Sequence, residues 1–155
     1  MKLNITAFIL AAGMLLMAAP VKAQSLQEVT AEGNKVYVEI VDEFAGTDNA
    51  FPEDEWEDVT NYSVEAGGWV LVKTPEEADF ILHIDVKKKV VMMSPRTWLT
   101  PSILLKDGTV LWKGKTFIGD ADVYNGFRAT NAALGKMLKK GFGKDLFPKI
   151  GRSTK

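Results

Sequence analysis

The sequence has 155 residues, of which 46% are apolar, 25% charged and 10% aromatic, a composition typical of one ordinary globular domain. It contains no cysteine and one histidine, so the usual zinc shells and a cysteine nucleophile are excluded. The 19 basic side chains nearly balance the 20 acidic ones, and this gives no cationic excess of the kind that binds nucleic acid. We therefore expect no nucleic-acid partner.

The first 23 residues are typical of an export signal peptide. Lys2 gives a positive start, residues 5–17 form a short apolar core, and a small-x-small cleavage site ends at Ala23. An uncleaved membrane anchor is the alternative, but a spanning helix needs roughly 20 apolar residues. No cysteine follows the apolar core, so we expect no lipid anchor. We predict cleavage after Ala23 and a mature chain without a transmembrane segment, in the bacterial periplasm or secreted.

The mature chain is expected to have three parts: a flexible leader over residues 24–34, a single domain over residues 35–150 and a polar tail over residues 151–155. This assignment depends on a change of pattern after Gly33 and Asn34, where a polar segment gives way to strand-like alternation. We find no internal repeat that would divide the domain further.

The first predicted elements are two strands separated by a helix, followed by a longer strand. Apolar residues alternate with others over residues 35–41, which is typical of a strand with one buried face. Pro52 suits the first turn of a helix that we predict to reach Ala66, because acidic residues follow Pro52 and two glycines follow Ala66. Residues 69–73 form a short apolar run, and residues 79–90 show the clearest alternation in the chain.

The second half of the chain begins with a predicted loop. Residues 92–101 hold two prolines, which a regular central strand excludes. Residues 102–106 and 109–117 are predicted to form a hairpin around Asp107 and Gly108, a dipeptide that tolerates the positive φ of tight turns.

The last predicted element is a helix over residues 123–142. Its apolar side chains recur at spacings of three and four, and Lys136, Lys139 and Lys140 complement its negative end. The resulting order is β-α-β-β-β-β-α. It predicts an α+β fold in which two helices pack on one face of a mainly antiparallel sheet of about five strands.

Charge is unevenly distributed along the chain. Residues 24–65 contain twelve acidic residues and one lysine, whereas residues 128–155 contain eight basic residues and one aspartate. The two segments could balance each other within the molecule, or the basic helix could dock on an acidic lipid surface or a partner. We favour internal balance, since exposed mixed charges usually need no special role.

Reactive side chains in a catalytic arrangement are not evident. His83 is the one imidazole that could act as a base, and it lies two residues from Asp85, but no serine occupies a G-x-S-x-G turn. We interpret His83 as a polar residue on the wetter face of a sheet. Acidic residues 53–58 could pair for catalysis, although stabilisation of a helix start is favoured. Residues 108–116 are one residue too long for a phosphate loop. We predict no catalytic, cofactor-binding or metal-binding residue.

The candidate binding residues are Met92, Met93, Arg96 and Trp98. They combine adaptable, cationic and planar side chains of the kind that carry interface energy. The alternative is that Trp98 and Leu99 cap the end of the core, because tryptophan is usually largely buried. An exposed sheet edge is a second candidate surface.

Three segments carry a family resemblance. They read Gly-Trp-Val-Leu-Val over residues 68–72, Pro-Glu-Glu-Ala-Asp-Phe-Ile-Leu over residues 75–82, and Leu-Lys-Asp-Gly-Thr-Val-Leu-Trp over residues 105–112. This rhythm resembles small envelope domains such as the amino-terminal domain of TolB and the CsgG-like group, in which an ADxxL strand precedes a hairpin bearing DGxxxW. The resemblance implies a noncatalytic α+β domain that contacts other envelope proteins.

Three hypotheses about function follow. The leading one is a small exported, noncatalytic domain that binds an envelope protein or a small ligand. The second is an enzyme that acts on an extracellular polymer with His83 or paired carboxylates. The third is peripheral membrane binding through the basic carboxyl-terminal helix. The sequence leaves the partner and the oligomeric state open.

Overall fold

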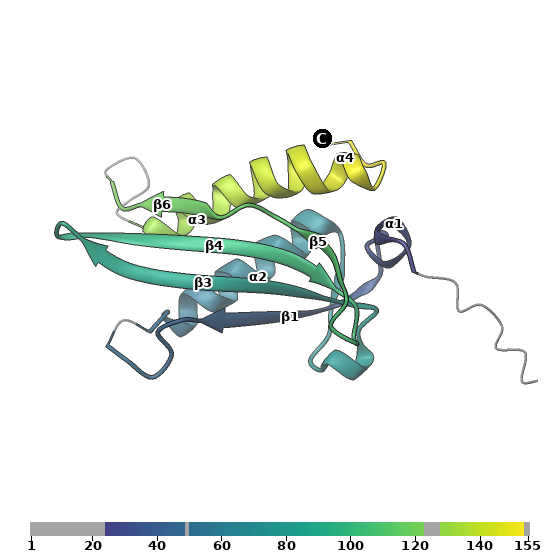
Figure 1. Cartoon of the computed structure of the whole chain (residues 1–155), viewed down its shortest axis with the longest axis horizontal. Helices are drawn as coiled ribbons and strands as arrows, with labels where there is room; N and C mark the ends of the chain where they lie inside the picture. The colour runs from purple at the N-terminus through teal and green to yellow at the C-terminus, as the bar shows by residue number, and fades with distance from the viewer. Residues whose placement is uncertain (1–23, 49, 123–127, 154–155) are drawn as a thin grey trace, which may run out of the picture.

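The computed structural model describes residues 24–48, 50–122 and 128–153. Its strands and helices follow one another in an order that begins and ends with helices (Figure 1). The elements are α1 (Leu26–Val29), β1 (Lys35–Asp42), α2 (Glu53–Gly67), β2 (Val70–Leu71), η1 (Pro75–Glu77), β3 (Phe80–Val91), β4 (Ser94–Leu104), β5 (Val110–Lys113), β6 (Phe117–Asp120), α3 (Ala129–Lys136), η2 (Met137–Leu146) and α4 (Phe147–Lys149).

The sheet is mixed and has six strands in the order β2-β1-β3-β4-β5, with β6 also paired to β4. β1 runs parallel to both β2 and β3, whereas β3, β5 and β6 run antiparallel to β4. The α+β class is confirmed, but the expectation of a mainly antiparallel sheet of about five strands is wrong in detail. The reason is α2, which carries the chain back along β1, so that β2 and β3 start at the same end as β1.

The predicted loop over residues 92–101 is wrong, because Ser94–Leu104 form the strand β4. The carbonyl oxygen of each proline in this segment accepts a backbone hydrogen bond. The four β4 residues from Arg96 to Leu99 pair with β6, and Pro95 and Pro101 lie on either side of that segment. Their carbonyls accept hydrogen bonds from the amides of Ala121 (3.1 Å) and Gly114 (2.8 Å). A proline costs a sheet only the bond that its missing N–H would have made.

The helices match the prediction in type more closely than in extent. α2 begins after Pro52 and ends at Gly67, followed by Gly68 at a φ of 63°. The described part of the carboxyl-terminal helix starts at Ala129 and continues, beyond the predicted end at residue 142, through a π-helical segment and α4 to Lys149. Its predicted start, at residues 123–127, lies outside the described residues.

The segment over residues 24–34, predicted to be a flexible leader, holds the short helix α1. Ser25 and Glu28 form a reciprocal capping box at its start. Val29 and Thr30 are buried, and the indole Nε1 of Trp69 donates to the carbonyl of Thr30 at 2.9 Å. The expectation is corrected because this segment covers the edge of the core beside Trp69.

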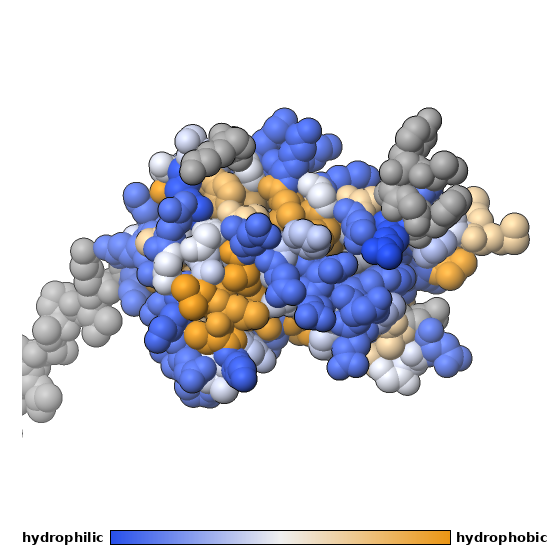
Figure 2. Space-filling model, turned by 180° about the vertical axis from the view of Figure 1, so that it is seen from behind, coloured by the Kyte–Doolittle hydropathy of each residue, from blue (hydrophilic) through white to orange (hydrophobic). Residues whose placement is uncertain are grey.

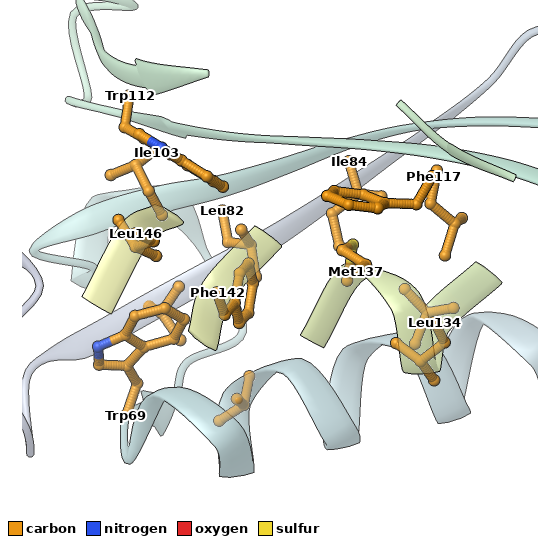
Figure 3. Close-up of a cluster of buried hydrophobic side chains, with 14 of the residues drawn as sticks. Trp69, Leu82, Ile84, Ile103, Trp112, Phe117, Leu134, Met137, Phe142 and Leu146 are labelled. Carbon is orange, nitrogen blue, oxygen red and sulfur yellow. The ribbon is translucent and has the colours of Figure 1, made fainter. Parts of the chain in front are cut away.

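One hydrophobic core lies between the sheet and the helices (Figure 3). The inward residues of β3 alternate along the strand and are at most 2% exposed. Two rings from distant parts of the chain, Trp69 and Trp112, lie edge to face with Phe142. The core residues that the strands and both long helices contribute include Val36, Val59, Phe80, Leu82, Ile84, Leu99, Ile103, Leu134, Met137 and Leu146.

The other face of the sheet carries the residues that alternate with the core. On β3 these are His83, Asp85 and Lys87, and on β4 they include Arg96 and Trp98. The candidate site lies on this uncovered sheet face and on the hairpin that extends it.

Within the described part of the chain, no helix is both long and apolar enough to cross a membrane.

Candidate binding surface

The turn between β3 and β4 presents two methionines at the end of the molecule. Val91 and Ser94 are the last paired residues, so Met92 and Met93 form a two-residue turn. Their φ angles are 49° and 66°, and each side chain is 96% exposed. Such turns favour glycine and asparagine, because other residues are strained at positive φ. In Figure 2 the tip projects from the right-hand end as an apolar group. Val90, two residues before Met92 on β3, is 59% exposed.

Arg96 and Trp98 extend this surface along the uncovered side of β4. The guanidinium of Arg96 lies 6.0 Å from the centre of the Trp98 ring and also pairs with the carboxylate of Asp120. Trp98 is half-buried on the face opposite the core, whereas Leu99 is completely buried within it. The alternative that Trp98 caps the core is therefore wrong, and only Leu99 fills that role.

A shallow groove of about 460 Å³ lies beside the Trp98 ring. Thr100 and Thr116 line it, and an ion pair between Lys87 and Glu43, with an N–O distance of 2.8 Å, closes one side. Val41, 43% exposed, adds apolar surface on the neighbouring strand. The hairpin tip, the Arg96–Trp98 pair and this groove form one surface, which we call the hairpin surface.

His83 lies on the uncovered face between two carboxylates. Its Nδ1 is 2.7 Å from Glu39 and its Nε2 is 3.1 Å from Asp85. Burial lowers the pKa of His83, but the hydrogen bonds with Glu39 and Asp85 outweigh burial and hold the pKa above its ordinary value. Because both ring nitrogens are engaged, the protonated ring bridges the two carboxylates and leaves no nitrogen free to accept a proton.

The acidic residues 53–58 lie in the first turns of α2, as the sequence predicts. Glu55 reaches Lys88 on β3 at 2.6 Å and also accepts a hydrogen bond from the hydroxyl of Thr130 on α3. Within the described ranges, no group of three or more histidine, cysteine or acidic side chains could hold a metal ion. Residues 110–113, within the segment that resembles a phosphate loop, form the strand β5.

The exposed edge strand β2 is a weaker candidate. Val70 and Leu71 are 49% and 46% exposed. The strand has only two residues, and Lys73 and Pro75 follow it closely. Short edges followed by lysine and proline discourage the addition of a further strand.

Val90 at the tip and Val41 beside the groove are not among the binding residues that the sequence predicts. Both lie in predicted strands, where the sequence gives no reason to expect a site. The same is true of Lys115, which the fold brings beside Lys140 and Lys144 of η2. Nothing local in the sequence links Lys115 to η2.

No family model and no curated protein matches the sequence. Among solved structures, the chain is similar to the PelC dodecamer from Paraburkholderia phytofirmans, with 17% identity, a TM-score of 0.48 and coverage of 70% of this chain and 85% of that one. A minor lipoprotein from Acinetobacter baumannii has 14% identity, a TM-score of 0.45 and coverages of 69% and 89%. The LpoB carboxyl-terminal domain from Salmonella enterica has 15% identity, a TM-score of 0.40 and coverages of 62% and 94%. At TM-scores below 0.5, these likenesses carry no argument about this chain.

Proposed function

We propose that this protein is a small noncatalytic domain of the bacterial envelope that binds another envelope protein through the hairpin surface. The observation that carries this proposal is the pair Met92 and Met93, each 96% exposed in a strained turn. Neither side chain contributes to the core. A turn that departs from the residues its geometry favours, and that presents flexible apolar side chains instead, is typical of a contact site.

The rest of the hairpin surface suits a protein partner. A tryptophan and an arginine in cation–π contact supply two of the residue types that dominate binding energy in interfaces. The groove beside the ring offers hydroxyl groups and a paired lysine and glutamate for the polar rim. The export signal that the sequence predicts over residues 1–23 supports a location where such partners are found.

The enzyme hypothesis receives less support from the geometry. His83 would need a free ring nitrogen to act as a general base. Its two nitrogens are instead engaged by Glu39 and Asp85. A noncatalytic role is therefore the one that we propose.

The proposal is tested by site-specific photocrosslinking in cells that make the protein. A photoreactive residue replaces Met92, and a matched one replaces Asp107 in the exposed turn between β4 and β5. We expect a discrete crosslinked envelope protein from position 92 and none from position 107. A W98A background is expected to lower the yield from position 92 by about tenfold or more, since anchors of this kind contribute about 2 kcal/mol or more.

Two results would contradict the proposal. One is the same crosslinking pattern from positions 92 and 107, which would indicate random encounters. The other is a yield from position 92 that Trp98→Ala leaves unchanged, because the tip would then act without the rest of the hairpin surface.

A further inference from the structure

Several basic residues of the carboxyl-terminal helix and of the segment after it pair with other groups of the molecule. Arg152 pairs with Glu32 at 2.8 Å, Lys149 pairs with Asp145 at 2.8 Å, and Lys136 donates to the carbonyl of Ile118 at 2.6 Å. The Arg152–Glu32 pair joins the acidic segment 24–65 to the end of the chain that follows α4. Internal balance therefore accounts for Arg152 but not for the lysines of η2.

Lys140 and Lys144 are exposed and lie about one turn apart on η2, the yellow helix along the top of Figure 1. They line a cavity of about 320 Å³ together with Lys115, which comes from the connection between β5 and β6. Ion pairs of the three ammonium groups are absent from the part of the chain that the structure describes. Three positively charged side chains thus line one cavity.

The floor and wall of the cavity are built by the core. Gly141 and the Phe117 ring line it, and a Cβ at position 141 would lie 2.8 Å from that ring. The close approach of helix and ring keeps the cavity at a fixed place on the scaffold. It does not depend on a loop whose ends are free to move.

One acid, Asp145, also lines the cavity, and its carboxylate is engaged by two other side chains. Asp145 accepts a hydrogen bond from the indole of Trp112 at 2.9 Å and pairs with Lys149. The hydrogen bond from Lys149, with contributions from Trp112 and the charge of Lys115, holds the pKa of Asp145 below its ordinary value despite partial burial. Its carboxylate therefore stays ionised and bound to its present partners, and the three lysines need an anion from outside.

We propose that Lys115, Lys140 and Lys144 bind a phosphate group of an envelope ligand in this cavity. Ammonium groups act as point charges that gather around a compact, multiply charged anion, whereas a planar carboxylate suits the fork of arginine better. The converging positive field also raises the local concentration of such an anion. The site lies on η2 and does not depend on the hairpin surface.

The experiment titrates the isotope-labelled full chain with inorganic phosphate and follows backbone amide shifts. We expect saturable shifts confined to residues around 115 and 140–145. Each lysine removed as K115Q, K140Q or K144Q is expected to weaken binding by about tenfold, the loss of one charge-assisted hydrogen bond. The triple variant should not bind, and its thermal midpoint should change little, because the loss of mutual repulsion among the lysines offsets the loss of the attraction between Lys115 and Asp145.

A matched control carries K35Q, K73Q and K106Q, three exposed lysines outside the cavity. It changes the net charge equally and is expected to bind phosphate as the unchanged chain does. Equal loss in this control, or equal shifts with acetate at the same ionic strength, would overturn the site. So would the absence of saturable, local shifts.

Vesicles identify the source of the phosphate. Binding to phosphatidylglycerol but not phosphatidylcholine vesicles, lost in the triple variant and competed by free phosphate, indicates a lipid headgroup. Local phosphate binding without vesicle binding indicates a soluble phosphate compound. Vesicle binding that the triple variant retains, with no effect of phosphate, contradicts the proposal. If the triple variant does not fold, K115Q serves alone, because Lys115 lies outside every helix.

Discussion

Met92 and Met93 occupy a turn in which asparagine or glycine would favour folding more. Both have positive φ, and neither side chain has neighbours that would offset the strain by packing. The turn at Asp107 and Gly108, beyond the other end of β4, shows the favoured solution, with Gly108 at a φ of 87°. The residues of the turn at Gly108 therefore favour folding, whereas the methionines do not. We infer that the methionines serve a role other than stability.

Replacing the first methionine by asparagine and the second by glycine, as M92N together with M93G, is expected to raise the free energy of unfolding by about 1–2 kcal/mol, because the strain of positive φ is relieved. Urea unfolding measures this change. The control is M92A with M93A, which removes the apolar side chains but keeps the strain and should leave stability close to that of the unchanged chain. A destabilised asparagine–glycine variant would show that the turn geometry is wrong.

His83 makes stability depend on pH in a defined direction. Its pKa is raised in the folded protein, so protonation favours the folded state. The contribution of the ring is fully present below its unfolded pKa of about 6.5 and is lost as the pH rises through the higher folded pKa.

The H83Q variant tests this direction. The unchanged chain is expected to be more stable than H83Q near pH 5.5, and the difference should shrink towards pH 9. Denaturant unfolding at several pH values measures it, with the same buffer ions throughout. A difference that stays constant across this range would show that His83 does not bridge the two carboxylates as an imidazolium.

At the scale of elements, the contact between β6 and α3 depends on a residue without a side chain. A Cβ at Gly119 would lie 2.0 Å from the carbonyl oxygen of Ala129 and 2.3 Å from the amide of Ala133. Gly135, on α3 itself, has nothing within 4 Å of such an atom. A side chain at position 119 would therefore clash with the backbone of α3, whereas one at position 135 would meet no neighbouring atom.

We expect G119A to lower the free energy of unfolding by about 1–3 kcal/mol or more, since helix and strand must separate to admit the methyl group. G135A should raise it by up to about 1 kcal/mol, because alanine favours helix more than glycine does. Thermal unfolding of the two variants side by side measures both. Equal effects would contradict the close packing of β6 on α3.

At the scale of the whole molecule, the two ends of the described chain meet. Arg152 donates to the carbonyl of Gly67 at 2.8 Å, pairs with Glu32 and lies 4.6 Å from the centre of the Phe147 ring. It thereby links the segment after α1, the end of α2 and α4. A domain without cysteine has no disulfides and depends on such contacts and on its core for stability.

R152Q is expected to lower the free energy of unfolding by about 1–3 kcal/mol, because it removes a charged hydrogen bond to a carbonyl and a cation–π contact. K149Q breaks an exposed pair with Asp145 and should change stability by less than about 1 kcal/mol. Urea unfolding compares the two variants. Limited proteolysis adds a second readout, since R152Q should expose residues 25–33 to cleavage. Similar effects from both variants would contradict a special role for Arg152.

The sequence by itself determined the elements whose signals are local. The alternation in β1 and β3, Pro52 and Gly68 at the ends of α2, and the turn at Gly108 each depend on a few neighbouring residues. The α+β class followed from their order. The sequence also proposes Met92 and Trp98 as binding residues, because their chemistry is visible without a fold, and this stays a prediction.

Only the tertiary structure decided which strands pair, and the physical reason is that pairing joins residues far apart in the chain. β4 tolerates Pro101 because, on the side away from β3, this residue faces the gap between β5 and β6. No local sequence pattern shows this gap. Glu39 reaches His83 across 44 positions, and Lys115 meets Lys144 only after β6 and α3 have packed. Hydrogen bonding and charge act through space, so these sites exist only once the chain has folded.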